Sequence, residues 1–305
     1  MREIRKVGII GMGALGLMYG SMIKEGDPEA EVVYYMDRPR YERHKDEKNE
    51  VNGVEKTFTM KPSDEAVPCD LIIVAVKYNS LPSALDTMAK AVGDDTIIIS
   101  VMNGISTEKI IGKRFGTEKV LGCVALGMDA MHFPGKLIYT KSGKLALGTL
   151  TEGQEEKLST LDAFLTKAGL AHEIHENILI EMWAKFMLNV GCNQTCMVFE
   201  CGYGGMLKEG TIENMTAVAA MREVILLAGK KGIPISEKDL ERYFHILSTL
   251  DPKATPSMGQ DRINKNKSEV EMFAGEVMAL AKEEGIRVPA NAYLYKRVHE
   301  IEAEY

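Results

Sequence analysis

Val7-Gly8-Ile9-Ile10-Gly11-Met12-Gly13-Ala14-Leu15-Gly16 is the most informative stretch of this 305-residue sequence. A short apolar segment typical of a buried strand leads into three glycines spaced G-x-G-x-x-G, and a helix-compatible run begins at the last of them. In such a turn the first glycine permits a tight bend, the second lets a pyrophosphate approach the backbone, and the third lets helix and strand pack closely. The phosphate charge then lies at the helix N-terminus, where the peptide dipoles favour an anion. The sequence therefore predicts a dinucleotide site at residues 11–16, with a plain glycine turn as the alternative.

The residues that follow the next apolar segment bear on which dinucleotide is bound. The segment 31–36 predicts a strand, and Asp37 follows it, about 20 residues after the glycine turn. An acidic residue at this position can hold the ribose hydroxyls of NAD, whereas Arg38 and Arg40 can pair with the additional phosphate of NADP. Basic residues such as Arg38, Arg40 and Arg43 can also form a plain solvated face. We favour NADP, and NAD stays open because of Asp37.

Apolar and amphipathic segments alternate through the first half of the chain. The segments 71–76 and 96–101 are short, β-branched and continuously apolar, as expected of parallel strands covered on both faces. A helical stretch at 81–91 lies between them, and this alternation predicts a doubly wound α/β sheet. Helical patterns separated by Gly and Pro dominate the second half. We therefore expect a dinucleotide-binding Rossmann domain at residues 1–172 and an all-helical C-terminal domain at residues 173–305.

The second half contains five segments with helical periodicity, at residues 177–193, 211–231, 236–247, 257–284 and from 291 to the end. Ser257 and Gln260 have the spacing of a capping box at the start of the fourth segment, which is a complete structural explanation for both. Within that predicted helix Asp261, Lys265 and Glu269 share one face and can form a surface ion ladder.

Composition and charge limit the classes of protein to consider. The formal net charge of -7 argues against a nucleic-acid coat, because neutralising phosphates needs clustered Lys and Arg. No stretch approaches the roughly 20 apolar residues that span a bilayer. The basic start Met1–Lys6 leads straight into the strand and the glycine turn, which argues against a signal peptide. Five cysteines without paired spacing fit a reducing cytoplasm, so we expect a cytoplasmic protein that binds neither nucleic acid nor a membrane.

Three of the cysteines, Cys192, Cys196 and Cys201, form a cluster that raises the question of a metal site. Zinc sites usually take four Cys or His ligands at tighter spacing, and no histidine lies nearby. Small packing residues in an apolar helix are the simpler interpretation. We expect no metal.

Polar residues follow two predicted strands at the carboxyl edge of the sheet, where open parallel sheets bind ligands. Lys77 directly follows the strand at 71–76, and Asn103-Gly104 lies just beyond the strand at 96–101. Both can be simple turn residues, because Asn-Gly is a common turn pair. Their equivalent positions favour a functional role.

The helix predicted at 177–193 has polar residues at every fourth position, namely Glu181, Lys185, Asn189 and Asn193, which places them on one face. One interpretation is a solvent-facing strip with an ordinary ion pair between Glu181 and Lys185. The other is a polar wall facing a cleft in an otherwise buried helix, and the apolar flanks favour it.

Together these motifs resemble the ketopantoate reductase (2-dehydropantoate 2-reductase) family over nearly the whole chain. The resemblance rests on the glycine turn, Val76-Lys77, Asn103-Gly104, Trp183-x-Lys185-x-x-x-Asn189-x-x-x-Asn193, and Ser257-Met258-x-Gln260-Asp261 followed by Glu269. It implies a Rossmann domain followed by a helical domain, with the active site in the cleft between them. It also implies NADPH-dependent reduction of a 2-oxo acid, first of all 2-dehydropantoate (ketopantoate) to pantoate in pantothenate biosynthesis.

The resemblance further implies a role for each matching residue. Lys185 would be the general acid that protonates the carbonyl oxygen of the substrate, and Glu269 would hold and tune that lysine. The substrate would be positioned by Asn103, Asn189, Asn193 and Ser257 with support from Asp261, while Lys77 and Asn103 would lie near both nicotinamide and substrate. The chemistry is consistent, because an ammonium group attracts an anionic substrate and stabilises developing alkoxide charge. A buried ammonium group also requires a carboxylate partner.

Some positions depart from the family pattern, and other functions stay open. Residues 253–256 lack the Asn that usually precedes Ser257, and Met102 stands where Gln is usual; in the family, these positions read substrate shape. A 3-hydroxyacid or 6-phosphogluconate-type dehydrogenase shares the Rossmann-plus-helices plan and is the alternative enzyme class. A nucleotide-binding regulator without turnover is the non-enzyme alternative. The oligomeric state is open, with a homodimer as one option.

Overall fold

The structure, a computed structural model, describes residues 3–305 and divides by its internal contacts into two compact units. The first unit comprises the described residues up to 102 and residues 107–178; the second comprises residues 103–106 and 179–305. Met1 and Arg2, the start of the basic N-terminal stretch, lie outside the described residues. This division falls after residue 178 rather than after residue 172, because β12 (His172–Ile174) pairs with β11 (Ser142–Gly148) of the first unit.

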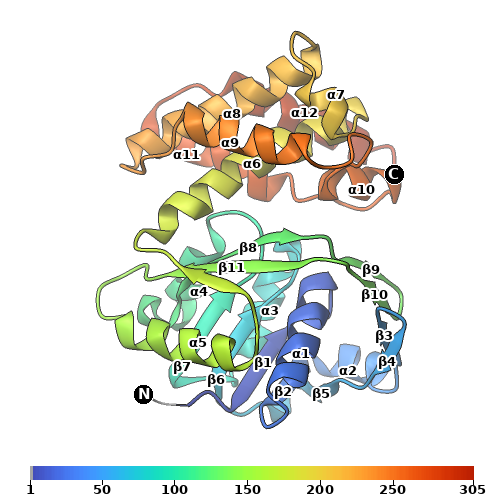
Figure 1. Cartoon of the computed structure of the whole chain (residues 1–305), viewed down its shortest axis with the longest axis vertical. Helices are drawn as coiled ribbons and strands as arrows, with labels where there is room; N and C mark the ends of the chain where they lie inside the picture. The colour runs from blue at the N-terminus through green and yellow to red at the C-terminus, as the bar shows by residue number, and fades with distance from the viewer. Residues whose placement is uncertain (1–2) are drawn as a thin grey trace. The chain divides into compact units, whose positions relative to one another are not determined.

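The first unit is built on a sheet of five parallel strands in the order β5-β2-β1-β6-β7 (Figure 1). The strands are β1 (Lys6–Ile10), β2 (Glu31–Met36), β5 (Thr59–Pro62), β6 (Cys69–Val74) and β7 (Val92–Ser100). Each neighbouring pair runs parallel, which confirms the predicted doubly wound sheet. Because β2 lies on one side of β1 and β6 on the other, the chain reverses its winding at β1. The carboxyl end of β1 is therefore the switch point at which such sheets bind ligands.

Helices and short turns connect many of the strands of the first unit (Figure 1). They are α1 (Ala14–Gly26), α2 (Arg38–His44), α3 (Leu81–Met88), α4 (Thr107–Phe115) and α5 (Glu155–Lys167), with short 3-10 turns η1 (Ser63–Glu65), η2 (Tyr78–Ser80) and η3 (Thr117–Lys119). Two smaller sheets complete the unit, in the orders β4-β3-β10-β9 and β12-β11-β8. Their remaining strands are β3 (Asn49–Val51), β4 (Val54–Lys56), β8 (Gly122–Met128), β9 (Met131–Phe133) and β10 (Lys136–Ile138).

The second unit is helical, as predicted. Its elements are α6 (Ile178–Phe199), α7 (Tyr203–Leu207), α8 (Ile212–Lys230), α9 (Glu237–Ser248), α10 (Ser257–Ile263), the π-helical turn η4 (Glu271–Gly275), α11 (Glu276–Glu284) and α12 (Pro289–Glu302). Fully buried side chains of α6, α8 and η4, among them Phe186, Met221 and Phe273, share one hydrophobic core. No helix within residues 3–305 combines the length and the apolarity needed to cross a membrane.

The single helix predicted at 257–284 is wrong, because the chain leaves the helix after Ile263. Lys265 takes a left-handed conformation with φ of +52°, and the N–H of Asn266 donates to the carbonyl of Asp261 at 2.8 Å. This pattern closes helix ends, and glycine usually occupies the left-handed position. Asp261, Lys265 and Glu269 therefore do not share a helical face, and the predicted ion ladder along that face is also wrong.

The predicted capping box at Ser257 is wrong as well. The N-cap of α10 is Pro256, which has no side-chain acceptor to offer, and Ser257 is the first helical residue. The Ser257 hydroxyl therefore does not cap its own helix. It accepts a hydrogen bond from Asn193 instead.

Glu108, in the first turn of α4, is a buried carboxyl group whose charge the fold disfavours. Burial raises its pKa from 4.5 to about 7, although the Thr107 hydroxyl lies 2.9 Å from its Oε2. Because the folded pKa is raised, the stability that this group contributes is present below about pH 4.5 and is lost as the pH rises through about 7. The difference between the ordinary pKa of 4.5 and the folded pKa of about 7 corresponds to a loss of folding free energy on the order of 3 kcal/mol.

We therefore expect Glu108→Gln to raise the free energy of unfolding at pH 8 and to change it little at pH 4.5. Urea unfolding at the two pH values measures this difference, with Glu152→Gln, at an exposed position, as the matched control. Equal effects of Glu108→Gln at both pH values would show that the fold does not disfavour the carboxylate.

Candidate functional site

The glycines of the predicted dinucleotide turn serve different physical purposes. Gly11 has φ of +111°, and a Cβ atom there would lie 2.3 Å from the carbonyl oxygen of Ala75. A Cβ atom on Gly16 would lie 2.0 Å from the carbonyl oxygen of Gly11. A Cβ atom on Gly13, by contrast, would meet no described atom within 4 Å. The fold itself thus requires Gly11 and Gly16, whereas Gly13 leaves open space beside the backbone.

The N-terminus of α1 adjoins that open space. Gly13 is the N-cap, no described side chain caps the helix, and its first turn holds no acidic residue. The first N–H groups of a helix have no partner within the helix and attract anions. The other turn residues, Met12, Ala14 and Leu15, pack against the core of the first unit. The turn therefore fits the pyrophosphate of a dinucleotide, in both the space it leaves and the donors it presents.

Two charged residues, Asp37 and Arg38, follow β2 at the carboxyl edge of the main sheet, which is the edge that carries the glycine turn. The Asp37 carboxylate caps α2 by accepting a hydrogen bond from the Arg40 N–H at 2.8 Å. Arg38 Nε donates to Asp64 Oδ2 at 3.1 Å, and Arg38 Nη2 contacts Asp64 and lies 2.8 Å from Glu65 Oε1. Arg38 is thus paired with the carboxylates of Asp64 and Glu65 and does not belong to a plain solvated face. Asp64 and Glu65 were missed by the sequence analysis, because strand β5, which precedes them, carries no strong apolar run.

Lys77 lies just beyond β6, at the carboxyl edge of the main sheet. Its backbone is extended, with φ of -73° and ψ of 150°, and its carbonyl accepts a hydrogen bond from the Ser80 N–H at 2.8 Å. The side chain is exposed. Lys77 therefore begins a turn, and its ammonium group remains accessible at the edge that carries the glycine turn.

Asn103 belongs by its contacts to the second unit, although it follows β7 in sequence. The next residue, Gly104, has φ of +88°, and a Cβ atom there would lie 2.6 Å from Met272 Cγ. This close approach brings the Asn103 side chain to Glu269, whose Oε2 accepts from Asn103 Nδ2 at 3.1 Å. Asn189 Nδ2 lies 3.5 Å from Asn103 Oδ1. Three predicted site residues from distant parts of the sequence thus form one hydrogen-bonded group.

Asn193 and Ser257 form a second contact one helical turn further along α6. Asn193 Nδ2 donates to Ser257 Oγ at 3.2 Å. Asn189 and Asn193 are buried, with 7% and 6% of their surface exposed, so these two residues do not form a solvent-facing strip. Their burial supports the interpretation of α6 as a helix with an internal polar wall.

The other members of the predicted set lie on α6 itself, on α10 and just before η4. Lys185 is half-buried on α6 and precedes Asn189 by one turn, on the same face. Glu269 lies just before η4 and accepts the Asn103 hydrogen bond described above. Asp261 is buried in α10, one turn after Ser257. Glu181, at the start of the polar stripe, lies 3.6 Å from Arg242.

The three cysteines of the cluster form a chain of neighbouring thiols. A hydrogen bond to Cys192 and burial raise the pKa of the Cys196 thiol, and contact with Cys196 raises the pKa of Cys201. Within residues 3–305 no group of three or more His, Cys, Asp or Glu side chains is arranged to hold a metal ion.

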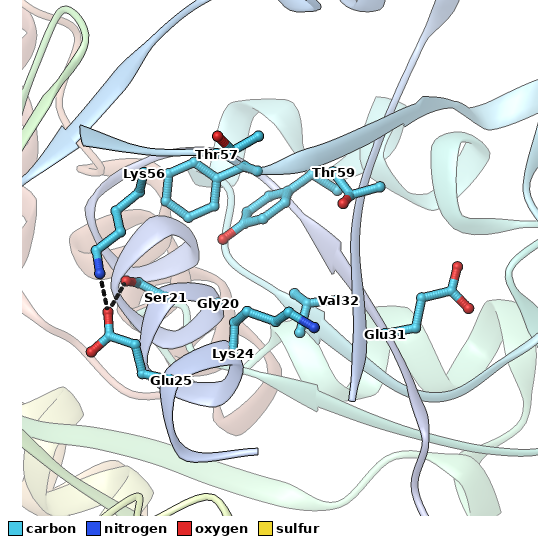
Figure 2. A pocket seen from close by; sticks show the side chains of 11 residues that line it. Gly20, Ser21, Lys24, Glu25, Glu31, Val32, Lys56, Thr57 and Thr59 are labelled. Carbon is cyan, nitrogen blue, oxygen red and sulfur yellow. Dashed lines mark hydrogen bonds and ion pairs between the residues drawn. The ribbon is translucent and has the colours of Figure 1, made fainter. Parts of the chain in front are cut away.

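A cavity of about 200 Å³ in the first unit lies beside the second half of α1 (Figure 2). Glu25 bridges two residues there, because its Oε1 accepts from the Ser21 hydroxyl at 2.8 Å and pairs with Lys56 Nζ at 3.0 Å. Its lining residues include none of the predicted site residues. This cavity is therefore separate from the glycine turn, which lies at the other end of α1.

Comparisons with known proteins cover both units. A family model described as "Ketopantoate reductase PanE/ApbA" matches residues 7–152, and one described as "Ketopantoate reductase PanE/ApbA C terminal" matches residues 177–302. A 2-dehydropantoate 2-reductase from Streptococcus pyogenes is 25% identical over 305 residues, covering 97% of each chain.

Solved structures agree with this match at the level of the fold. A D-mandelate dehydrogenase in complex with NADH superposes with a TM-score of 0.86 at 24% identity, covering 98% of this chain and 99% of that chain. A 2-dehydropantoate 2-reductase from Geobacter metallireducens gives a TM-score of 0.84 at 22% identity, covering 97% and 99% of the two chains.

Proposed function

The chain belongs to the ketopantoate reductase family, and on this premise we propose that it reduces a 2-oxo acid to a 2-hydroxy acid with NADPH. The first substrate to test is 2-dehydropantoate, with pantoate as the product. The observation that carries the proposal is the partly buried, hydrogen-bonded group of Asn103, Asn189 and Glu269. Lys185 lies one turn before Asn189 on the same face of α6. Family membership favours this reaction over that of a 3-hydroxyacid-type dehydrogenase.

In this proposal the first unit holds the cofactor, which supplies the hydride for the carbonyl carbon. The backbone at Gly13 and the first N–H groups of α1 bind the pyrophosphate, because they combine open space with unpaired donors. Arg38 and Asp37 lie at the position that contacts the adenosine ribose in Rossmann domains. We assign Lys77 and Asn103 to binding of the nicotinamide and the substrate.

Lys185 is the proposed general acid. As the carbonyl carbon gains a hydride, negative charge develops on the carbonyl oxygen, and the Lys185 ammonium group donates a proton to that oxygen. The same positive charge attracts the substrate carboxylate and stabilises the transition state. Solvent then returns a proton to the neutral amine.

Glu269 is proposed to keep Lys185 protonated and oriented. An ammonium group that leaves bulk water needs a carboxylate partner, and Glu269 is the acidic member of the partly buried, hydrogen-bonded group. Its own orientation is fixed by the Asn103 amide, which donates to Glu269 Oε2. Glu269 therefore acts through Lys185, as a positioning residue.

Asn189, Asn193 and Ser257 are proposed to orient the substrate. Their amide and hydroxyl groups are held by the hydrogen bonds from Asn189 to Asn103 and from Asn193 to Ser257. Such groups can exchange these bonds for bonds to the carboxylate and hydroxyl oxygens of a substrate at small reorganisation cost. Asp261 supports this set from α10.

Substrate class is tested by following NADPH oxidation with a panel of 2-oxo acids and, in reverse, NADP⁺ reduction with 3-hydroxy acids. We expect turnover with 2-dehydropantoate and with 2-oxo acids of similar size, and none with 3-hydroxy acids. Turnover restricted to 3-hydroxy acids would contradict the proposal. Binding of NADPH without any turnover would instead support a nucleotide-binding regulator. A homodimer remains a prediction, which sedimentation velocity of the purified chain tests.

A further inference from the structure

We infer that Asp64 and Glu65 weaken the preference of this protein for NADPH over NADH by competing with the 2′-phosphate of NADPH for Arg38. The inference rests on the proposed nicotinamide-dependent function. It assigns a specificity-determining role to two residues that lie outside the glycine turn and outside the substrate group.

The sheet itself brings these carboxylates to Arg38. Strands β2 and β5 pair in parallel, and the register places Met36 opposite Pro62. Arg38 and Asp64 each lie two residues beyond that pair, so they leave the sheet at the same carboxyl edge. The η1 turn, which contains Asp64 and Glu65, is anchored at both ends, because the flanking residues Pro62 and Ala66 are buried. A hydrogen bond from Lys90 Nζ to the Asp64 carbonyl, at 2.9 Å, restrains the turn further.

The contacts occupy the donors that Arg38 would offer to a phosphate. Asp64 accepts from Nε and contacts Nη2, and Glu65 accepts from Nη2 at 2.8 Å. The fork geometry of a guanidinium group suits bidentate binding of a carboxylate or of a phosphate, but the same donors cannot fully serve both. A 2′-phosphate must therefore displace at least part of the carboxylate pair.

The local charge also weakens binding of the 2′-phosphate of NADPH. Asp64 and Glu65 place two carboxylates at the guanidinium group of Arg38, and Asp37 precedes it in the sequence, although Arg40 and Arg43 follow on α2. A phosphate at this position would meet two carboxylates at close range, and like charges at such distances repel. Because the groups are about half exposed, solvent screening limits the penalty to roughly a factor of ten in affinity.

NADH avoids this penalty. It carries a hydroxyl group where NADPH carries the phosphate, and it can donate a hydrogen bond to the Asp37 carboxylate without needing Arg38. The cap of α2 uses only one oxygen of Asp37, the one that accepts from the Arg40 N–H. We therefore expect the wild-type protein to use NADH with a kcat/KM within about tenfold of that for NADPH.

The test is the ratio of kcat/KM for NADPH to that for NADH in the double variant Asp64→Asn/Glu65→Gln. The variant keeps the size of both side chains and removes the competing charge, so the ratio is expected to rise about tenfold or more. The kcat/KM for NADH should stay within about twofold of wild type. The matched control is Glu42→Gln/Asp46→Asn, which removes the same charges from nearby exposed positions without touching Arg38.

Two further measurements separate the outcomes. Adding Arg38→Ala to the double variant should abolish the gain, because the released guanidinium group is its cause. A ratio that is unchanged in the double variant, or raised equally in the control, would overturn the inference while leaving the proposed function intact. Direct titration of the wild-type protein with NADPH and with NADH tests the proposed function itself. If the protein bound neither cofactor, both the proposed function and this inference would be overturned.

Discussion

We expect replacement of Lys185 by alanine to lower the turnover of NADPH-dependent 2-oxo acid reduction by at least ~100-fold, whereas binding of NADPH should survive. In the proposed mechanism Lys185 donates a proton to the carbonyl oxygen as negative charge develops there, and an alanine side chain can neither donate a proton nor attract the substrate carboxylate. The glycine turn that is proposed to bind the pyrophosphate belongs to the first unit and is unchanged in this variant. Steady-state kinetics and a fluorescence titration with NADPH measure the two effects separately.

Two control variants give the Lys185 result its meaning. Lys238→Ala removes an exposed lysine from α9 in the same unit and should leave turnover unchanged. Glu269→Gln keeps the Asn103 contact possible but removes the negative charge, and should lower kcat and shift its pH profile rather than only raise KM. Near-normal turnover of Lys185→Ala would remove the basis of the proposed mechanism.

Replacing Gly13 by valine is expected to weaken NADPH binding by roughly 100-fold without loss of stability. The new side chain enters the space that a pyrophosphate needs, and two lost hydrogen bonds to a charged group account for an effect of this size. The folded chain itself tolerates the change, because a Cβ atom on Gly13 meets no described atom within 4 Å and its φ is -83°. Isothermal titration and thermal unfolding measure affinity and stability.

Other glycines provide the matched comparisons. Gly229, in α8, also leaves open space around an added Cβ atom, so Gly229→Val should leave the affinity for NADPH unchanged. Gly16→Ala should instead destabilise the first unit, because its Cβ atom would lie 2.0 Å from the Gly11 carbonyl oxygen. If Gly13→Val bound NADPH as tightly as wild type, the pyrophosphate could not lie at this turn.

The parts of the fold that the sequence predicts best are those set by local pattern. Continuous apolar runs with β-branched residues identified β1, β2, β6 and most of β7, since strands buried on both faces cannot alternate. The helical second half followed from periodicity and from Gly and Pro signals. Short edge strands such as β5 escaped prediction, because their residues are only partly buried and carry no strong pattern.

The errors in the second unit lie at the two ends of α10 and have separate physical causes. Lys265 adopts the left-handed conformation that closes α10, a position at which sequence analysis expects glycine. The sequence therefore does not show where α10 ends, nor that Asp261 and Glu269 lie on different elements. The N-cap at Pro256 was hidden too, because Ser257 and Gln260 have the right spacing for a capping box that does not form.

The candidate site was only partly accessible to sequence analysis. The polar face of α6 was visible from its spacing, but its partners were not, because Asn103 and Glu269 lie far from it along the chain. Only the resemblance to a family connected them before the structure did. Asp64 and Glu65 could not be connected to Arg38 at all, since that contact depends on the register between β2 and β5.

The central claim, that this chain transfers a hydride from NADPH to a 2-oxo acid, is tested most directly by a single-turnover experiment. The protein is loaded with one equivalent of NADPH and mixed with excess 2-dehydropantoate; nicotinamide absorbance is followed, and the product is identified by mass spectrometry. We expect loss of all bound NADPH with formation of an equal amount of pantoate. Bound NADPH that stays reduced in the presence of 2-dehydropantoate and of every other 2-oxo acid offered would contradict it.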